Sequence, residues 1–203
     1  MTIHYQKAYF LLSVADIKQL PPDKGIEVAI VGRSNSGKSS VLNRFTQNKG
    51  LARVSKTPGR TQHINIFVLD HHRRLIDLPG YGYAKAPLSA QKKWQKTVDA
   101  YIGTRKSLKG IVMIMDIRHP LAPLDCQLLD YANHQQLSVH ILLNKADKLS
   151  KTAATTTLQQ VKTLLKGYTH SVTVQVFSAF RGIGVEELRK HMDKWYKAVY
   201  NDV

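Results

Sequence analysis

The sequence is short of cysteine and of long apolar runs. Cys126 is the single cysteine among 203 residues, so no disulfide can form within the chain and no C-x-x-C pair offers a zinc site. No apolar run approaches the length of a transmembrane helix, and residues 1–6 lack the basic and apolar regions of a secretory signal. We therefore expect a protein of the reducing cytoplasm with no membrane segment, and we expect it to act as a monomer.

Acidic residues are also scarce. The chain has 14 Asp and Glu against 30 Lys and Arg, which gives a formal net charge of +16 at pH 7. A polyanion is the simplest partner for such an excess, and nucleic acid is favoured over a membrane because no strongly amphipathic basic helix stands at either end. A basic surface that only keeps the protein soluble is the alternative. The length and the 43% of hydrophobic residues predict one domain with a full core.

One stretch matches the phosphate-binding pattern G-x-x-x-x-G-K-S, and it reads Gly32-Arg33-Ser34-Asn35-Ser36-Gly37-Lys38-Ser39, with Ser40 following. The apolar residues 27–31 before it predict a buried strand, and Val41, Leu42 and Phe45 after it share one face of a helix. Backbone amides and the helix N-terminus would bind phosphate, Lys38 would reach the β- and γ-phosphates, and Ser39 would bind Mg²⁺. A glycine-rich turn that merely joins strand to helix is the bland alternative.

A second motif, Asp77-Leu78-Pro79-Gly80, ends another predicted strand. A carboxylate there can hold Mg²⁺ through its water shell, and the Gly80 amide can meet a γ-phosphate. The pattern is weak by itself because turns use Asp and Gly freely, but it gains weight at this distance after a phosphate loop. In the basic, glycine- and proline-containing loop 50–62, Thr57 and Thr61 are both candidate Mg²⁺ ligands.

Two further stretches favour guanine. Asn144-Lys145-Ala146-Asp147 follows an apolar strand, and Asp147 can accept two hydrogen bonds from the guanine N1 and N2 groups, a donor pair that adenine does not have. Asn144 can contact N7 or O6, and the Lys145 stem can cover the base plane. After the last strand come Phe177-Ser178-Ala179, whose backbone amides could meet guanine O6 and reject an adenine amino group.

These motifs occur in the order found in small P-loop GTPases, and the chain resembles the YihA/EngB family of bacterial ribosome-assembly GTPases over roughly residues 25–200. The residues that carry this resemblance are the phosphate loop, Lys56-Thr57-Pro58-Gly59-Arg60-Thr61-Gln62, Asp77-Leu78-Pro79-Gly80-Tyr81-Gly82-Tyr83-Ala84 and Asn144-Lys145-Ala146-Asp147. It implies an α/β, three-layer, Ras-like G domain over residues 25–203, with a mostly parallel six-stranded sheet, helices on both faces, and residues 1–24 as an extension packed on it.

The resemblance further implies GTP or GDP as ligand and Thr61 rather than Thr57 as the Mg²⁺ ligand, with Gly59, Arg60 and Gln62 beside the nucleotide. It implies binding to the large ribosomal subunit and its rRNA during maturation, and a link to cell division and septation. The basic segments 53–60 and 85–96 would then meet rRNA in the GTP state.

The expected hydrolysis depends on Lys38, Asn35 and Gly80. Ras has a water-orienting Gln directly after D-x-x-G, whereas this chain has Tyr81, so we expect slow intrinsic turnover with the missing group supplied by a partner or a cation. Asn35 resembles the Asn that binds K⁺ in GTPases activated by that ion, or it only stabilises the loop turn. Two other readings stay open: a small-molecule kinase, and a basic RNA-binding protein that holds guanine nucleotide without turnover.

Overall fold

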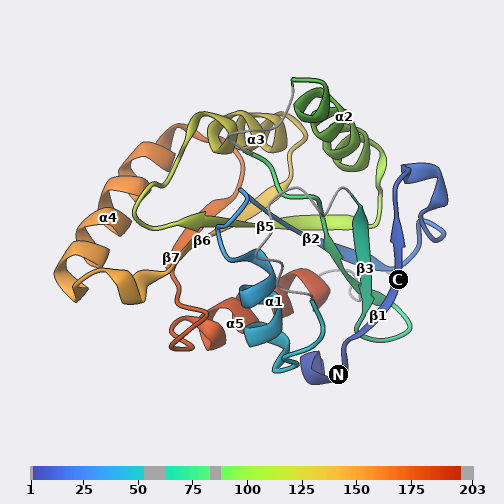
Figure 1. Ribbon diagram of the computed structural model, residues 1–203, viewed down its shortest axis with the longest axis horizontal. Helices are drawn as coiled ribbons and strands as arrows, with labels where there is room; N and C mark the ends of the chain where they lie inside the picture. The colour runs from blue at the N-terminus through green and yellow to red at the C-terminus, as the bar shows by residue number, and fades with distance from the viewer. Residues whose placement is uncertain (1, 53–62, 83–87, 198–203) are drawn as a thin grey trace.

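The computed structural model describes residues 2–52, 63–82 and 88–197, and it shows one twisted sheet with helices on both faces (Figure 1). The strand order is β1-β3-β4-β2-β5-β6-β7. The strands are β1 (Tyr9–Val14), β2 (Ile26–Gly32), β3 (Ile64–Val68), β4 (Arg73–Asp77), β5 (Leu108–Asp116), β6 (Ser138–Asn144) and β7 (Val172–Val176). β4, β2, β5, β6 and β7 are parallel, while β1–β3 and β3–β4 are antiparallel pairs.

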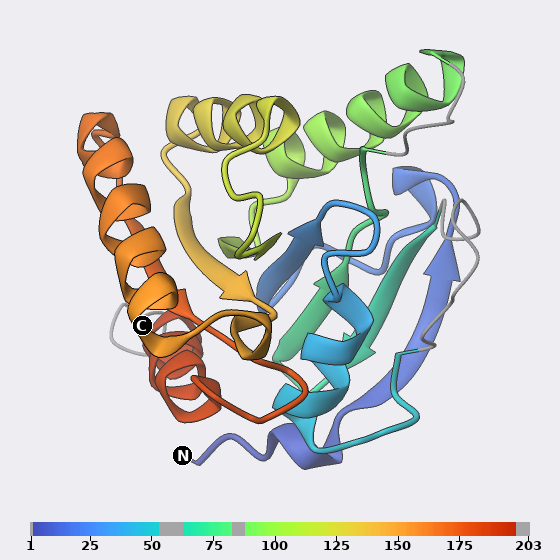
Figure 2. The same cartoon turned by 60° about the vertical axis from the view of Figure 1, so that its left-hand side comes forward.

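In the described residues, five α-helices connect or follow these strands. They are α1 (Lys38–Thr46), α2 (Leu88–Thr104), α3 (Pro123–His134), α4 (Lys151–Leu164) and α5 (Val185–Lys197). Four short 3₁₀ turns accompany them: η1 (Tyr5–Lys7), η2 (Ile17–Gln19), η3 (Ala146–Lys148) and η4 (Leu165–Gly167). Helices α1 and α5 cover one face of the sheet and α2, α3 and α4 the other, which confirms the predicted three-layer α/β fold (Figures 1 and 2).

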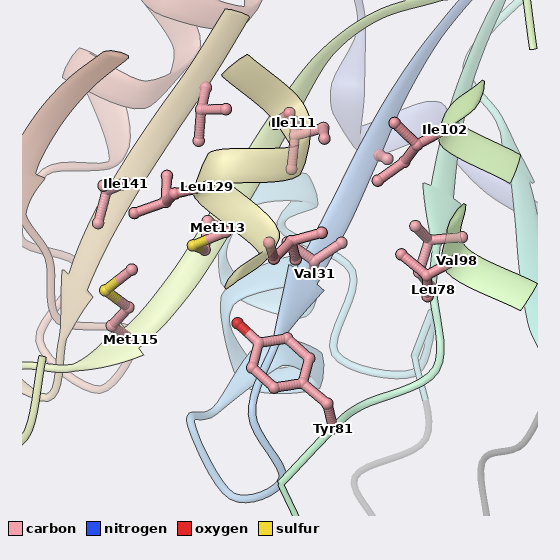
Figure 3. Close-up of a cluster of buried hydrophobic side chains, with 14 of the residues drawn as sticks. Val31, Leu78, Tyr81, Val98, Ile102, Ile111, Met113, Met115, Leu129 and Ile141 are labelled. Carbon is pink, nitrogen blue, oxygen red and sulfur yellow. The ribbon is translucent and has the colours of Figure 1, made fainter. Parts of the chain in front are cut away.

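The two cores follow from strand periodicity. Successive side chains point to opposite faces, and a parallel strand covered on both sides must be apolar throughout. In β2, Ala29 and Val31 enter the core beneath α2 and α3, while Val28 and Ile30 enter the core beneath α1 and α5. Figure 3 shows the first of these cores, in which Leu129 of α3 lies between Ile141 and Met113 from the sheet. The predicted helix faces also hold, since Val41, Leu42 and Phe45 are buried.

The sheet has seven strands, not the expected six. The extra strand is β1, which lies in the segment 1–24 and pairs antiparallel with β3 at the edge of the sheet. Its residues gave no clear alternation because an edge strand is covered on fewer sides. Tyr9, Phe10 and Leu11 are 55%, 51% and 41% exposed, and a register shift between Phe10 and Leu12 interrupts the pairing.

A buried carboxylate fixes the end of β2 that lies away from the phosphate loop. Glu27 is fully buried, and its oxygens accept hydrogen bonds from Arg105 Nη2 and Nε at 2.7 and 2.8 Å and from the Tyr101 hydroxyl at 2.7 Å. Burial alone would raise the pKa of Glu27, but the hydrogen bonds from Arg105 and Tyr101 outweigh it and hold the pKa below 4.5.

None of the helices in the described ranges combines the length and apolar content needed to cross a bilayer.

Replacing Glu27 with Gln is expected to lower the free energy of unfolding by about 3 kcal/mol at pH 7, because the buried guanidinium of Arg105 loses its close carboxylate partner and keeps only the longer contact with Asp23 at 3.6 Å. A folded-state pKa below the unfolded value means that the stabilisation is present above pH 4.5 and is lost as the pH falls through the folded pKa. Urea unfolding of both proteins from pH 7 to pH 3 should therefore show the difference shrinking.

Glu186→Gln is the matched control. Glu186 also pairs with an arginine, Arg189, at 2.6 Å, but its side chain is 76% exposed. An exposed pair contributes only about 0–1 kcal/mol. Equal losses in the two variants would contradict the structural role given to Glu27.

Candidate nucleotide-binding site

Residues 32–39 run from the end of β2 into α1 and form a tight loop. Gly37 has φ of 95° and Asn35 φ of 63°, so both occupy the left-handed region that Gly adopts freely and Asn tolerates. A Cβ at Gly37 would lie 2.4 Å from Asn144 Nδ2, and one at Gly32 would lie 2.7 Å from the Ile114 carbonyl oxygen. The two glycines of the motif are therefore required where the loop approaches β5 and β6.

The interior of this loop is suited to an anion. Helix α1 begins at Lys38, and its first intrahelical hydrogen bond is donated by Val41 to Gly37, so the amides of Lys38, Ser39 and Ser40 have no acceptor within the helix. The Ser36 hydroxyl is buried, and among the described residues it has no hydrogen-bond partner. Free amides, an unsatisfied hydroxyl and the positive end of a helix dipole fit a phosphate group.

Lys38 and Asp77 lie together at this loop, as the two motifs predicted. The Lys38 ammonium forms an ion pair with Asp77 Oδ1 at the end of β4. Asn65, which stands opposite Asp77 in the β3–β4 register, donates to Asp77 Oδ2 at 3.1 Å. The carboxylate is thereby fixed beside Lys38, the residue before Ser39, and carboxylate and hydroxyl oxygens are ligands that Mg²⁺ accepts. Asn65 was missed from the sequence, although a polar residue in an apolar strand was a signal for it.

The D-x-x-G segment is bonded directly to the phosphate loop. The Ser34 amide donates to the Tyr81 carbonyl oxygen at 2.7 Å, and Arg33 and Tyr81 form a parallel bridge. Leu78 is buried in the core, and the Pro79 carbonyl oxygen accepts from Trp94 Nε1 at 2.7 Å. A Cβ on Gly80 would meet nothing in the described residues closer than 3.5 Å, so no contact within them requires glycine there.

The two stretches predicted to bind guanine meet at Asn144. Its Nδ2 donates to the Ser36 carbonyl oxygen at 2.8 Å, and its Oδ1 accepts from the Ala179 amide at 3.2 Å. Asp147 Oδ1 accepts from the Ser178 hydroxyl at 2.5 Å, and the Ala146 amide donates to the Phe177 carbonyl oxygen at 3.1 Å. The buried amide of Asn144 thus joins the phosphate loop to the loop after β7.

Lys145 reaches back over the phosphate loop. Its φ is 66°, and its Nζ donates to the Asn35 carbonyl oxygen at 2.6 Å and lies 3.0 Å from Asp116 Oδ2. Burial opposes ionisation of Asp116, but hydrogen bonds from Arg118 and Lys145 lower the pKa of that carboxyl well below its usual value. Asp116 is therefore a charged anchor for Lys145, and no motif in the sequence pointed to it.

Tyr81 does not take the position of a water-orienting residue. It is buried, its ring packs on Trp94 at 4.9 Å, and its hydroxyl donates to Asp125 Oδ1 at 2.7 Å. Figure 3 shows the ring directed toward Val31 and Met113 in the core. Burial and the neighbouring carboxylate raise the pKa of Tyr81 well above 10, so the hydroxyl stays a donor to Asp125.

The described residues bring most of the predicted site together at one edge of the sheet, formed by the carboxyl ends of β2, β4, β6 and β7 (Figure 2). This is where open α/β sheets bind ligands. The predicted residues Gly59, Arg60, Thr61 and Gln62 lie outside the described residues, as do the basic segment 53–60 and residues 85–87 of the segment 85–96, whose remaining residues begin α2.

The fold and this site define a P-loop GTPase, and a family model described as "50S ribosome-binding GTPase" matches residues 27–145. The chain belongs to the EngB family of GTP-binding proteins. It is 50% identical over 194 residues to the probable GTP-binding protein EngB of Coxiella burnetii (strain RSA 493 / Nine Mile phase I), covering 96% of this chain and 95% of that one. With the EngB protein of Psychromonas ingrahamii the identity is 52% over 198 residues, covering 96% and 91%.

Solved structures show the same fold. A crystal structure of a probable GTP-binding protein engB superposes with a TM-score of 0.68 at 20% identity, covering 85% of this chain and 99% of that chain. Era, solved with MgGDPNP and nucleotides 1506–1542 of 16S ribosomal RNA, superposes with a TM-score of 0.64 at 22% identity, covering 85% and 57%.

Tyr81→Phe is expected to lower the free energy of unfolding by about 1–2 kcal/mol, because Asp125 keeps the bond from the Ala122 amide but loses the one from the hydroxyl. The rate of GTP hydrolysis per folded molecule should not change, since the hydroxyl faces the core. Thermal unfolding and single-turnover hydrolysis measure the two quantities. A rate loss of tenfold or more without loss of stability would instead place the hydroxyl in the reaction.

Proposed function

We propose that this chain is a GTP-driven switch that binds the large ribosomal subunit through rRNA during assembly, and that it is needed for normal cell division and septation. The observation that carries the proposal is the match to a family described as 50S ribosome-binding GTPase, in a chain with a net charge of +16. The Era structure, which holds ribosomal RNA, supports an RNA partner for this fold. The protein acts as a monomer in the cytoplasm.

Different residues of the chain would bind the phosphates, the guanine base and the metal. The amides at the start of α1 and the Lys38 ammonium bind the phosphate tail, and the Gly80 amide meets its end. Asp147 would bind the guanine N1 and N2 groups, and the Ala179 amide would share its hydrogen between Asn144 Oδ1 and guanine O6. Ser39, Thr61 and Asp77 would hold Mg²⁺, which when bound neutralises charge developing on the transferred phosphoryl group.

The ion pair between Lys38 and Asp77 would break when nucleotide binds. The Lys38 ammonium would then bind the phosphates, and the Asp77 carboxylate would bind the water shell of the metal. A phosphate tail and Mg²⁺ together offer each group a new partner of opposite charge, so the exchange conserves the number of charge pairs.

Intrinsic hydrolysis is slow in this proposal. Phosphoryl transfer to water needs a placed nucleophile, and in Ras that task belongs to the side chain directly after D-x-x-G. Tyr81 occupies this position and its hydroxyl is bonded to Asp125 in the core. No side chain in the described residues offers an amide at this position to orient the attacking water. A partner or a monovalent cation would therefore supply the missing group.

The exposed side chain of Asn35 supports a role for a monovalent cation in hydrolysis. Its carbonyl oxygen is held by Lys145, while its exposed side chain has no hydrogen-bond partner in the described part of the chain. GTP hydrolysis is therefore expected to be at least about tenfold faster in K⁺ than in Na⁺ at equal ionic strength, and Asn35→Ala should remove the difference. Asn35→Asp is the matched control, because it tolerates the same backbone φ and keeps an oxygen ligand. Equal rates in K⁺ and Na⁺ for the unmutated protein would refute the cation.

The switch itself is tested by sedimentation with purified large subunits. Association is expected with a non-hydrolysable GTP analogue and should weaken with GDP, because the γ-phosphate contacts of Gly80 and Thr61 exist only in the triphosphate state. Binding should fall steeply between 50 and 300 mM salt if basic side chains meet rRNA phosphates.

Turnover followed in the same tubes separates the remaining readings. Equal binding of subunits in both nucleotide states, with no hydrolysis in any salt, would favour an RNA-binding protein that keeps its nucleotide structurally. Preference for ATP over GTP in a competition titration would favour a kinase.

A further inference from the structure

Helix α1 reaches the guanine side of the site through Arg44, a residue that no motif contains. Arg44 lies in the last turn of α1, and its guanidinium donates from Nε to the Ala179 carbonyl oxygen at 2.6 Å and from Nη2 to the Phe180 carbonyl oxygen at 2.8 Å. The two bonds go to successive carbonyls of the loop that follows β7. A planar fork of donors suits such a pair of acceptors, and the positive charge strengthens both bonds.

These bonds close a ring of contacts. The Ala179 amide donates to Asn144 Oδ1, Asn144 Nδ2 donates to the Ser36 carbonyl oxygen, and Ser36 leads directly into α1, which carries Arg44. Both backbone polar groups of Ala179 are thus hydrogen-bonded, the amide to Asn144 and the carbonyl oxygen to Arg44. No other side chain in the described residues donates to the carbonyl oxygens of Ala179 and Phe180.

We propose that Arg44 is a positioning residue that fixes the loop 177–180, so that the Ala179 amide, which donates to Asn144 Oδ1 at 3.2 Å, can share its hydrogen with the O6 atom of guanine. The inference deepens the proposed function and rests on it. Arg44 does not reach the base; it acts through the carbonyls of Ala179 and Phe180. Its place on α1 also makes the position of the guanine loop depend on the helix that binds the phosphates.

The alternative is that Arg44 is one more exposed cation that attracts phosphate or RNA. The two readings differ in which nucleotide they affect. A loop that presents an amide to O6 matters only for bases that carry O6, whereas a diffuse positive charge acts on the phosphates that all nucleotides share.

The test compares GDP with 2-aminopurine riboside diphosphate, which keeps the 2-amino group but lacks O6 and the hydrogen on N1. The analogue loses the N1 hydrogen bond to Asp147 in every variant, so a change in the ratio of the two affinities reports on O6. Affinities come from competition with a fluorescent GDP analogue at fixed Mg²⁺ and salt. The unmutated protein should prefer GDP. Arg44→Ala should lower its affinity for GDP by about tenfold and leave that for the analogue within about twofold, so that the selectivity ratio falls by about the same tenfold.

Two further variants keep the test independent of folding. Arg44→Lys retains the charge but not the fork, and we expect it to recover only part of the ratio. Arg189→Ala removes an arginine that donates to the Phe45 carbonyl oxygen of the same helix at 3.3 Å without touching the loop, and its ratio should equal that of the unmutated protein. Thermal unfolding reports the stability of each variant.

An unchanged ratio in Arg44→Ala, with both nucleotides weakened equally or not at all, would overturn the proposal. Full recovery of the ratio by Arg44→Lys would also overturn it, because charge alone would then be sufficient. Failure of the unmutated protein to bind GDP would instead refute the nucleotide site itself, which keeps the two failures distinguishable.

Discussion

The buried side-chain amide of Asn144 is the contact on which the site depends. Asn144 is 2% exposed. Its Nδ2 donates to the Ser36 carbonyl oxygen, and its Oδ1 accepts from the Ala179 amide. A buried amide that loses a partner incurs the desolvation cost of the group, about 1–3 kcal/mol. The phosphate loop and the loop after β7 therefore stabilise each other through Asn144. Gly37 belongs to the same constraint, because any side chain there would occupy the space of the Asn144 amide.

The central strand β2 is held differently at its two ends. At one end Glu27 is buried among arginines and a tyrosine, and it anchors the strand to α2 and to the segment that precedes β5. At the other end the strand leads into the phosphate loop with its glycines and into the first turn of α1, where the amides of Lys38, Ser39 and Ser40 have no acceptor within that helix. The separation is physically sensible because a ligand can bind only to groups that folding has left unsatisfied, and the strand must be fixed elsewhere.

The sequence predicted the parts of the structure whose pattern is local. The phosphate loop, the helix faces and the central strands each depend on residues a few positions apart, and their predicted arrangement is confirmed. β1 could not be predicted with the same clarity, because three of its neighbouring residues are apolar and yet exposed at an edge. Asn65, Asp116 and Arg44 were missed because each acts on a residue distant along the chain, so that only the folded structure brings the partners together.

Tyr81 shows why a motif position does not determine a role. The sequence places it where Ras carries a Gln, and from the sequence alone its hydroxyl could face either the nucleotide or the core. The fold decides for the core, because the ring fills space beside Trp94 and the hydroxyl satisfies Asp125, whose carboxylate would otherwise be buried with one partner fewer. Turning the ring toward the nucleotide would leave unfilled space beside Trp94 and would leave Asp125 with only the hydrogen bond from the Ala122 amide. A residue's place directly after D-x-x-G therefore does not by itself assign its side chain to the reaction, because the packing and hydrogen bonds of the core decide which way that side chain faces.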